Sequence, residues 1–284
     1  MLNNFLLLLT AAIWGFAFVA QRVGMEYLGP FLFNGVRFAL GGISLLPVLY
    51  VSRGRIPRPK GSSLRAGILA GGLLFGGASL QQIGIQFTTA GKAGFITGLY
   101  VVLVPIFGSF LGTRSGRLRW MGAISTATGL YLLSVKTGFS INPGDFLVFL
   151  SAFFFAGHVL YLARVSPHQD PIVLSILQYL AVSLGSLLVA TLTEKIQFQL
   201  LLSAWLPILY GGIFSVGIAY SLQVIAQKKA HPTHAAILLS MEGFFAAIGG
   251  TILLGERLTP KEMIGALLML GGMILSQWSP KKDE

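Results

Sequence analysis

Residues 238–260 read LLSMEGFFAAIGGTILLGERLTP, an apolar run that carries one carboxylate, Glu242, inside its hydrophobic part. In a helix, Glu242 would lie about three turns after His231 and about four turns before Glu256. At a rise of about 1.5 Å per residue, this spacing places Glu242 well inside a hydrocarbon layer about 30 Å thick. An ionisable group at that depth is costly and usually faces a bundle interior or an aqueous cavity. The stretch therefore predicts a membrane-spanning helix with a candidate functional group.

The composition extends this interpretation to the whole chain. Of the 284 residues, 54% are hydrophobic and only 10% are charged, whereas a soluble domain has about 25% charged residues. Long continuous apolar runs favour helices over the alternating strands of a barrel. The chain has no cysteine, which excludes disulfides and thiolate metal sites. The net charge of +11 comes from residues in predicted loops, so it does not indicate nucleic-acid binding.

Ten apolar runs joined by short loops predict an all-α integral membrane protein with ten transmembrane helices. The runs cover residues 5–20, 31–51, 64–87, 93–111, 118–135, 145–163, 172–192, 205–226, 233–254 and 260–278. The first run has no basic residue before it. Because a cleaved signal peptide needs a positively charged start, we interpret this run as a spanning helix.

The positions of the basic residues predict the orientation. If the N-terminus is cytoplasmic, 13 of the 20 lysines and arginines fall in inside loops and the C-terminal tail, and six fall on the outside. The remaining residue, Arg37, lies within a helix. Basic residues in short loops resist translocation. Both termini are therefore expected to be cytoplasmic, in the inner or plasma membrane of the cell.

The two halves of the chain repeat one another. Ser79-Leu80-Gln81 returns as Ser221-Leu222-Gln223 after half the length of the chain, and Pro30-Phe31 matches Pro171-Ile172 at nearly the same offset. Further matches with this offset recur later in both halves. Five helices per copy is an odd number, so the second copy must enter the membrane inverted. We therefore expect two inverted five-helix repeats, residues 1–140 and 141–284, as in alternating-access carriers.

At this point several motifs together resemble a known family. They are Trp14-Gly15, the LGERLT segment at residues 254–259, Gly265 and Gly271-Gly272, within the doubled five-helix unit. The chain resembles the ten-helix EamA branch of the drug/metabolite transporter superfamily over essentially its whole length. The resemblance implies an exporter of small metabolites such as amino acids and their derivatives, nucleoside-type compounds or toxic cations. Family members often have a proline after the ninth-helix glutamate, where this chain has Gly243.

Three charged residues are the main candidates for substrate binding or coupling. Glu242 could bind a substrate amine, carry a coupling proton or hydrogen-bond a neighbouring helix. Arg37 could hold a substrate carboxylate, or tie a carbonyl or Glu242 as a structural contact. Lys92 could also meet a substrate, although a lysine at a helix end more often snorkels to water. Glu242 with Arg37, and Lys92 if it reaches the site, would offer opposite charges to a zwitterion such as an amino acid.

Further polar and aromatic residues are candidate walls of a cavity. The repeat places Gln81 opposite Gln223 and Arg37 opposite Gln178, although a glutamine in a membrane helix is more often a helix–helix contact. The aromatic and histidine candidates, for which packing is the commoner role, are Trp14, Tyr100, His158, Tyr161 and Tyr220. His231 and His234 are close in sequence with no companion acid or thiol, so no metal site is expected.

These observations favour a secondary transporter that exports small organic metabolites, with no cofactor and no nucleic-acid partner. An embedded enzyme is not expected, since no hydrolase, metalloprotease or P-loop motif occurs. Two alternatives of the same architecture stay open, a carrier of lipids, nucleoside-type compounds or cationic drugs, and a scaffold that transports nothing. Proton coupling, and a monomer or a homodimer, also stay open.

Overall fold

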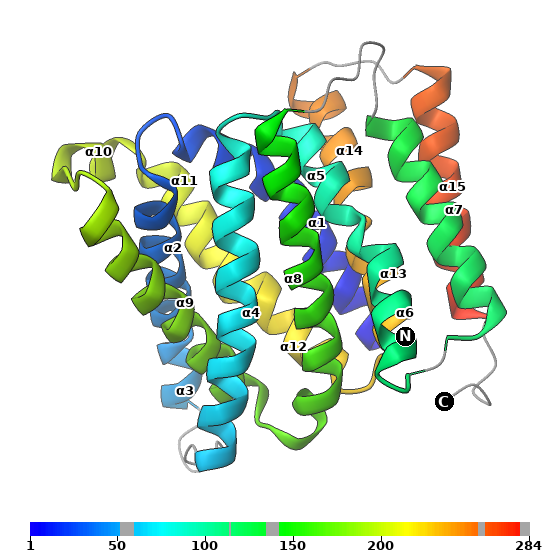
Figure 1. The fold of residues 1–284 in the computed structure, drawn as a ribbon, viewed down its shortest axis with the longest axis horizontal. Helices are drawn as coiled ribbons and strands as arrows, with labels where there is room; N and C mark the ends of the chain where they lie inside the picture. Colours follow the sequence, from blue (N-terminus) through cyan, green and yellow to red (C-terminus); the bar gives the residue numbers. More distant parts are fainter. Residues whose placement is uncertain (52–59, 114, 135–141, 255–258, 279–284) are drawn as a thin grey trace.

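The computed structural model describes residues 1–51, 60–113, 115–134, 142–254 and 259–278. Over these ranges the chain consists of helices and connecting loops and contains no strand, which confirms the all-α prediction. The helices lie roughly side by side in one bundle (Figure 1).

Each of the ten predicted ranges contains helix, but several of them are divided. The first half of the chain forms α1 (Leu2–Gly24), α2 (Pro30–Ser44), α3 (Leu46–Val51), α4 (Gly61–Ile85), α5 (Ala90–Gly98), α6 (Tyr100–Phe110) and α7 (Arg117–Ser134). The second half forms α8 (Pro143–Val165), the 3₁₀ turn η1 (Ser166–His168), α9 (Pro171–Thr193), α10 (Phe198–Ser203), α11 (Trp205–Leu209), the π-helix η2 (Tyr210–Tyr220), α12 (Ser221–Gln227), α13 (Pro232–Leu239), α14 (Glu242–Leu254) and α15 (Pro260–Gln277).

Within the described residues, seven helical segments are long and apolar enough to cross a membrane. They are Leu2–Gly24, Pro30–Val51, Gly61–Ile85, Ala90–Phe110, Pro143–His168, Pro171–Thr193 and Trp205–Gln227. A shorter apolar helix covers Pro232–Ile248. The other two predicted ranges form α7 and α15, each of 18 residues. The chain is thus an all-helical membrane protein.

Proline and a side-chain cap define several helix starts. In α9, Pro171 occupies the first turn and the Asp170 carboxylate accepts hydrogen bonds from the backbone N–H groups of Ile172 and Val173. At α15, Thr259 accepts from the backbone of Glu262 and Glu262 accepts from the backbone of Thr259. This reciprocal capping box satisfies two N–H groups that the helix leaves unpaired.

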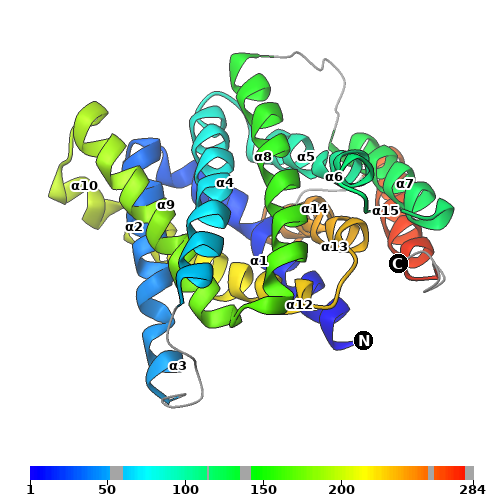
Figure 2. The same cartoon turned by 60° about the horizontal axis from the view of Figure 1, so that its bottom comes forward.

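Close backbone contacts hold α7 against α15 at one edge of the bundle (Figures 1 and 2). A Cβ added at Gly122 would lie 2.7 Å from the carbonyl oxygen of Gly272, and one at Gly129 would lie 2.5 Å from that of Gly265. Such distances leave no room for a side chain, so only glycine permits this approach. The hydroxyl of Ser125 donates to the carbonyl oxygen of Leu268 at 2.9 Å between the same two helices.

Two helical segments are interrupted at matching positions. The Ala90–Phe110 segment divides at Leu99, so that α6 begins at Tyr100, and the segment from Pro232 divides at Ser240 and Met241, so that α14 begins at Glu242. The two starts are 142 residues apart. The interruption before Glu242 is present although the residue that follows Glu242 is Gly243 and not a proline. It places Glu242 at the first position of a half-helix inside the bundle.

Candidate functional site

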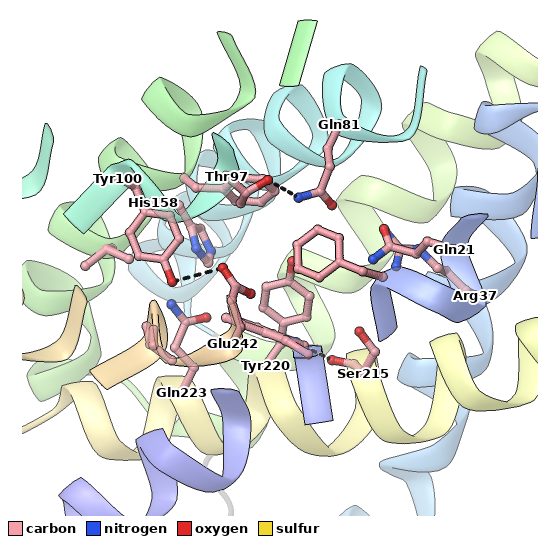
Figure 3. A pocket seen from close by; sticks show the side chains of 15 residues that line it. Gln21, Arg37, Gln81, Thr97, Tyr100, His158, Ser215, Tyr220, Gln223 and Glu242 are labelled. Carbon is pink, nitrogen blue, oxygen red and sulfur yellow. Dashed lines mark hydrogen bonds between the residues drawn. The ribbon is translucent and has the colours of Figure 1, made fainter. Parts of the chain in front are cut away.

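A cavity lies at the centre of the bundle, where both interruptions meet α1, α2, α4, α8 and η2 (Figure 3). Its charged and polar lining residues are Gln21, Arg37, Gln81, Thr97, His158, Ser215, Gln223 and Glu242. Its aromatic and aliphatic lining residues are Trp14, Phe18, Tyr100, Phe155, Val159, Tyr220 and Leu239. A few convergent polar groups among apolar walls are typical of sites for small organic ligands.

Glu242 is buried, with 3% of its surface exposed. The hydroxyl of Tyr100 donates a hydrogen bond of 3.3 Å to carboxylate oxygen Oε1 of Glu242 (Figure 3). Among the described residues, no cation forms an ion pair with Glu242. The second carboxylate oxygen, Oε2, therefore remains for a ligand or a proton.

Arg37 reaches the same cavity from α2 and is 2% exposed. Its Nε donates to Oδ1 of Asn34 at 2.9 Å, and Asn34 in turn donates to the carbonyl oxygen of Ala78 on α4 at 3.1 Å. The guanidinium carbon lies 5.5 Å and 5.1 Å from the ring centroids of Phe33 and Phe38, where a cation interacts favourably with the aromatic faces. These contacts hold the Arg37 side chain in place. Of its three guanidinium nitrogens, only Nε takes part in them as a hydrogen-bond donor.

Hydrogen bonds orient several of the neutral polar groups. Gln81 Nε2 donates to the hydroxyl of Thr97 at 2.9 Å, across α4 and α5. His158 Nε2 and Gln178 Oε1 are 2.9 Å apart, across α8 and α9. The Oε1 atom of Gln223 is buried without a hydrogen-bond partner. An unpaired amide oxygen in a buried position can accept from a donor group of a ligand.

An aromatic wall joins α1 to the π-helix η2. The rings of Trp14 and Tyr220 lie 4.5 Å apart between centroids, and the indole N–H of Trp14 donates to the carbonyl oxygen of Ser215 at 3.1 Å. The hydroxyl of Tyr210 donates to the carbonyl oxygen of Ile13 at 2.9 Å. A π-helix leaves backbone carbonyls displaced from the usual pairing, and such segments occur frequently at functional sites.

The structure brings eight of the eleven candidate residues together around this cavity. They are Trp14, Arg37, Gln81, Tyr100, His158, Tyr220, Gln223 and Glu242. Gln178 stands behind His158 as its hydrogen-bond partner. Tyr161 lies elsewhere, in a second cleft at the ends of α4 and α8.

Lys92 also lies outside the cavity lining and contacts an acid that the sequence did not single out. Its Nζ is 2.9 Å from Oδ2 of Asp145, at the start of α8. The other carboxylate oxygen of Asp145 accepts a 2.5 Å hydrogen bond from the hydroxyl of Thr88. This cluster ties the loop between α4 and α5 to the start of α8.

Sequence reasoning missed several lining residues, among them Phe18, Gln21, Thr97, Phe155 and Ser215. The sequence repeat could have identified some of these residues. Phe155 is the repeat equivalent of Trp14, and Thr97 is that of Leu239. Applying the offset to every candidate, rather than to the glutamines and Arg37 alone, would have found Phe155.

The cavity is small in this conformation. Its volume is about 40 Å³, which is room for about three water molecules at roughly 10–15 Å³ each. Pockets that hold organic ligands have about 300–1,000 Å³. An organic ligand therefore requires the helices around the cavity to move apart.

Within the described ranges, no group of three metal-ligating side chains occurs. His231 and His234 are engaged in hydrogen bonds with other residues. The Nδ1 atom of His231 accepts from the backbone N–H of Thr233 at 3.3 Å, and the ring nitrogens of His234 lie 2.8 Å from the hydroxyl of Ser276 and 3.1 Å from Oδ1 of Asn4. His231 thus caps the start of α13, and His234 joins α13 to α15 and α1.

A bundle of apolar helices around an internal cavity with buried opposite charges has the features of a membrane carrier. In agreement with this class, the sequence model of the EamA-like transporter family matches residues 1–135 and 142–278. The chain belongs to this family and is a membrane transporter.

Individual relatives match over nearly the full length. An "uncharacterized transporter" of Archaeoglobus fulgidus is 33% identical over 95% of this chain and 83% of the relative. The "uncharacterized inner membrane transporter YedA" of Escherichia coli K12 is 24% identical over 93% and 86%. A "probable amino-acid metabolite efflux pump" of Salmonella typhimurium is 23% identical over 96% and 94%. A solved crystal structure with 20% identity has a TM-score of 0.80 over 96% of both chains, which shows a shared fold.

Proposed function

We propose that this transporter exports small zwitterionic metabolites, amino acids or closely related compounds, through the central cavity. The observation that carries the proposal is the presence of Arg37 and Glu242 in one buried lining. Arg37 would bind the substrate carboxylate with its free guanidinium nitrogens, and Glu242 would bind the substrate ammonium group. The aromatic wall of Trp14 and Tyr220 would contact the apolar part. The printed name of the Salmonella relative is consistent with this substrate class.

We further propose ten membrane spans in two inverted five-helix repeats, residues 1–140 and 141–284. The cavity lining supports this, because most of its residues form pairs that are separated by half the length of the chain. The pairs are Trp14 and Phe155, Phe18 and Val159, Gln81 and Gln223, Thr97 and Leu239, and Tyr100 and Glu242. A site on the axis between two repeats takes equivalent residues from both copies.

The helix contacts give independent support for a two-fold axis. By the same repeat, Gly122 corresponds to Gly265 and Gly129 to Gly272. Gly122 contacts Gly272, and Gly129 contacts Gly265, which is the reciprocal pattern of a two-fold interface. Equivalent residues touch each other only near such an axis, and Tyr100 and Glu242 are in contact across 142 residues of sequence.

Alternating access would then supply the movement that the small cavity requires, with one repeat rocking against the other around the site. We place both termini in the cytoplasm and the protein in the inner or plasma membrane of the cell. Glu242 could in addition carry a coupling proton, since one of its oxygens has no partner among the described residues.

The test is a mass-spectrometric comparison of metabolites in the medium of cells that overproduce the wild type, Glu242→Gln, Arg37→Gln or an empty vector. We expect one or more amino acids or related zwitterions to accumulate with the wild type only. Glu26→Gln and Arg22→Gln are matched controls, because they remove the same charges outside the cavity, and they should export like the wild type.

The two site variants also separate the alternatives. A cationic substrate requires Glu242 but not Arg37, whereas a zwitterion requires both. Wild-type export by both variants, with each shown to be folded in the membrane, would refute the proposal. If the media of the wild type and the empty vector contain the same metabolites, the next experiment measures lipid movement in vesicles. If no lipid moves there either, the scaffold alternative is favoured.

A further inference from the structure

A second cleft lies where α4 begins and α8 ends, and it shares no lining residue with the central cavity. The first turns of α4 contribute Arg65 and Leu69, the last turns of α8 contribute Tyr161 and Arg164, and η1 contributes His168. The volume of this cleft is about 740 Å³. Among the described residues, the cleft is therefore open enough for a large group without any movement of the helices.

The mouth of the cleft is positively charged. The side chains of Arg65, Arg164 and His168 are exposed, and within the described residues neither arginine forms an ion pair. At the rim, Lys228 Nζ donates to the carbonyl oxygen of Gln169 at 3.2 Å. The adjacent carboxylate, Asp170, is engaged in capping α9. The described side chains thus offer several cations to an anion that enters here.

The cleft has an apolar lining residue one helical turn further along α4 than Arg65. Arg65 is the fifth residue of the helix and Leu69 the ninth, which separates them by about 6 Å along the axis. Leu69, which lines the cleft, is 56% exposed, and its chain neighbour Ile68 is 53% exposed. A ligand that satisfies both parts has an anionic head at the membrane surface and an apolar chain that continues toward the bilayer interior.

We propose that this cleft binds an anionic phospholipid, with its phosphate between Arg65 and Arg164 and an acyl chain against Leu69. Basic pockets between transmembrane helices on the cytoplasmic side are typical sites for anionic headgroups, and the cleft lies on the side expected to be cytoplasmic. A zwitterionic lipid is disfavoured, because its ammonium group would meet the same cations. The proposal does not depend on which metabolite the central cavity carries.

The test uses detergent-purified full-length protein mixed with equimolar phosphatidylglycerol and phosphatidylcholine of identical acyl chains. Native mass spectrometry then measures how much of each lipid stays bound. We expect the wild type to retain phosphatidylglycerol in clear excess. Arg65→Gln or Arg164→Gln should each weaken this retention about five-fold, and the double variant about 30-fold, from the contribution of one basic residue near an anionic surface.

Arg117→Gln is the matched control, because Arg117 is exposed at the start of α7 on the same predicted side and does not line the cleft. It should retain the lipid like the wild type, and Arg164→Lys should retain more than Arg164→Gln. Equal retention of the two lipids by the wild type, or an equal loss in Arg117→Gln, would overturn the proposal. Displacement of the lipid by millimolar inorganic phosphate would overturn the lipid assignment in favour of a free phosphate site. A monodisperse elution profile for each variant excludes misfolding as the cause of a loss.

Discussion

Replacing Gly15 with alanine should weaken the contact between α1 and α14 at the backbone of Glu242. A Cβ at Gly15 would lie 2.8 Å from the carbonyl oxygen of Glu242, and 2.9 Å from the backbone nitrogen of Ala246 and from the Cβ of Phe245. The first two atoms belong to the backbone of α14, so they cannot move away by a change of side-chain rotamer. The two helices must therefore move apart to admit the methyl group.

The size of the stability loss can be worked out by comparison with a glycine at which an added Cβ would meet no other atom. Gly72 lies in the middle of α4, is exposed, and has no atom within 4 Å of its virtual Cβ. Glycine-to-alanine substitution in a helix contributes about 0.5–1 kcal/mol of stability through backbone entropy at both sites. Overpacking costs about 1–3 kcal/mol, at Gly15 only. The entropic gain cancels in the comparison, so Gly15→Ala should be less stable than Gly72→Ala by about 1–3 kcal/mol.

The assay is thermal unfolding of both variants and the wild type in the same detergent, at one heating rate because unfolding of such proteins is often irreversible. Gly72→Ala should unfold at or above the wild-type temperature and Gly15→Ala below it. Export should also fall in Gly15→Ala, since the displaced segment of backbone carries Glu242. If the two variants unfold at the same temperature, the close contact of α1 with α14 is not as described.

Two further predictions concern a helix cap and the orientation. Glu194 should stabilise the start of α2, because its two carboxylate oxygens accept from the backbone N–H groups of Phe31 and Leu32 at 2.8 and 2.9 Å; Glu194→Ala should cost about 1 kcal/mol in thermal unfolding, with the exposed Lys195→Ala near neutral. Cysteines introduced singly into this cysteine-free chain at Lys60 and Lys195 should react with an impermeant reagent from the cytoplasmic and the outer side respectively, and the reverse result would invert the predicted orientation.

Apolar runs were enough to predict where helices occur. All ten predicted ranges contain helix, because a long hydrophobic run without competing polar pattern has few alternatives in lipid. The burial of Glu242 also followed from spacing alone, since a helix converts residue number directly into distance.

The interruptions inside helices could not be predicted in this way. Neither Leu99 nor Ser240 is adjacent to a proline, and hydropathy is the same for a straight and a broken apolar helix. The π-helix η2 likewise has no separate sequence pattern. Both features depend on how neighbouring helices pack, which a single sequence does not display.

Contacts between residues distant in sequence explain why Lys92 and Tyr161 lie outside the central cavity, although the sequence made them candidates for it. Lys92 had the position of a lysine that snorkels to water, yet it meets Asp145 from 53 residues away. Tyr161 shares α8 with His158, but the two side chains line different spaces. Which of two sites a residue serves depends on which neighbouring helices pack against it.

The interruptions at Leu99 and at Ser240 and Met241 divide the centre of the bundle into two pairs of half-helices. Helix α5 packs against α14, and α6 packs against α13 (Figure 1). The turns between them are tightened, with Leu99 N–H bonded to the Ile96 carbonyl and Met241 N–H to that of Leu238. In the alternating-access movement proposed above, each turn would act as a pivot at the level of the Tyr100–Glu242 contact. One pair would then spread while the other stays closed, so that a path would open to one side of the membrane without a continuous pore.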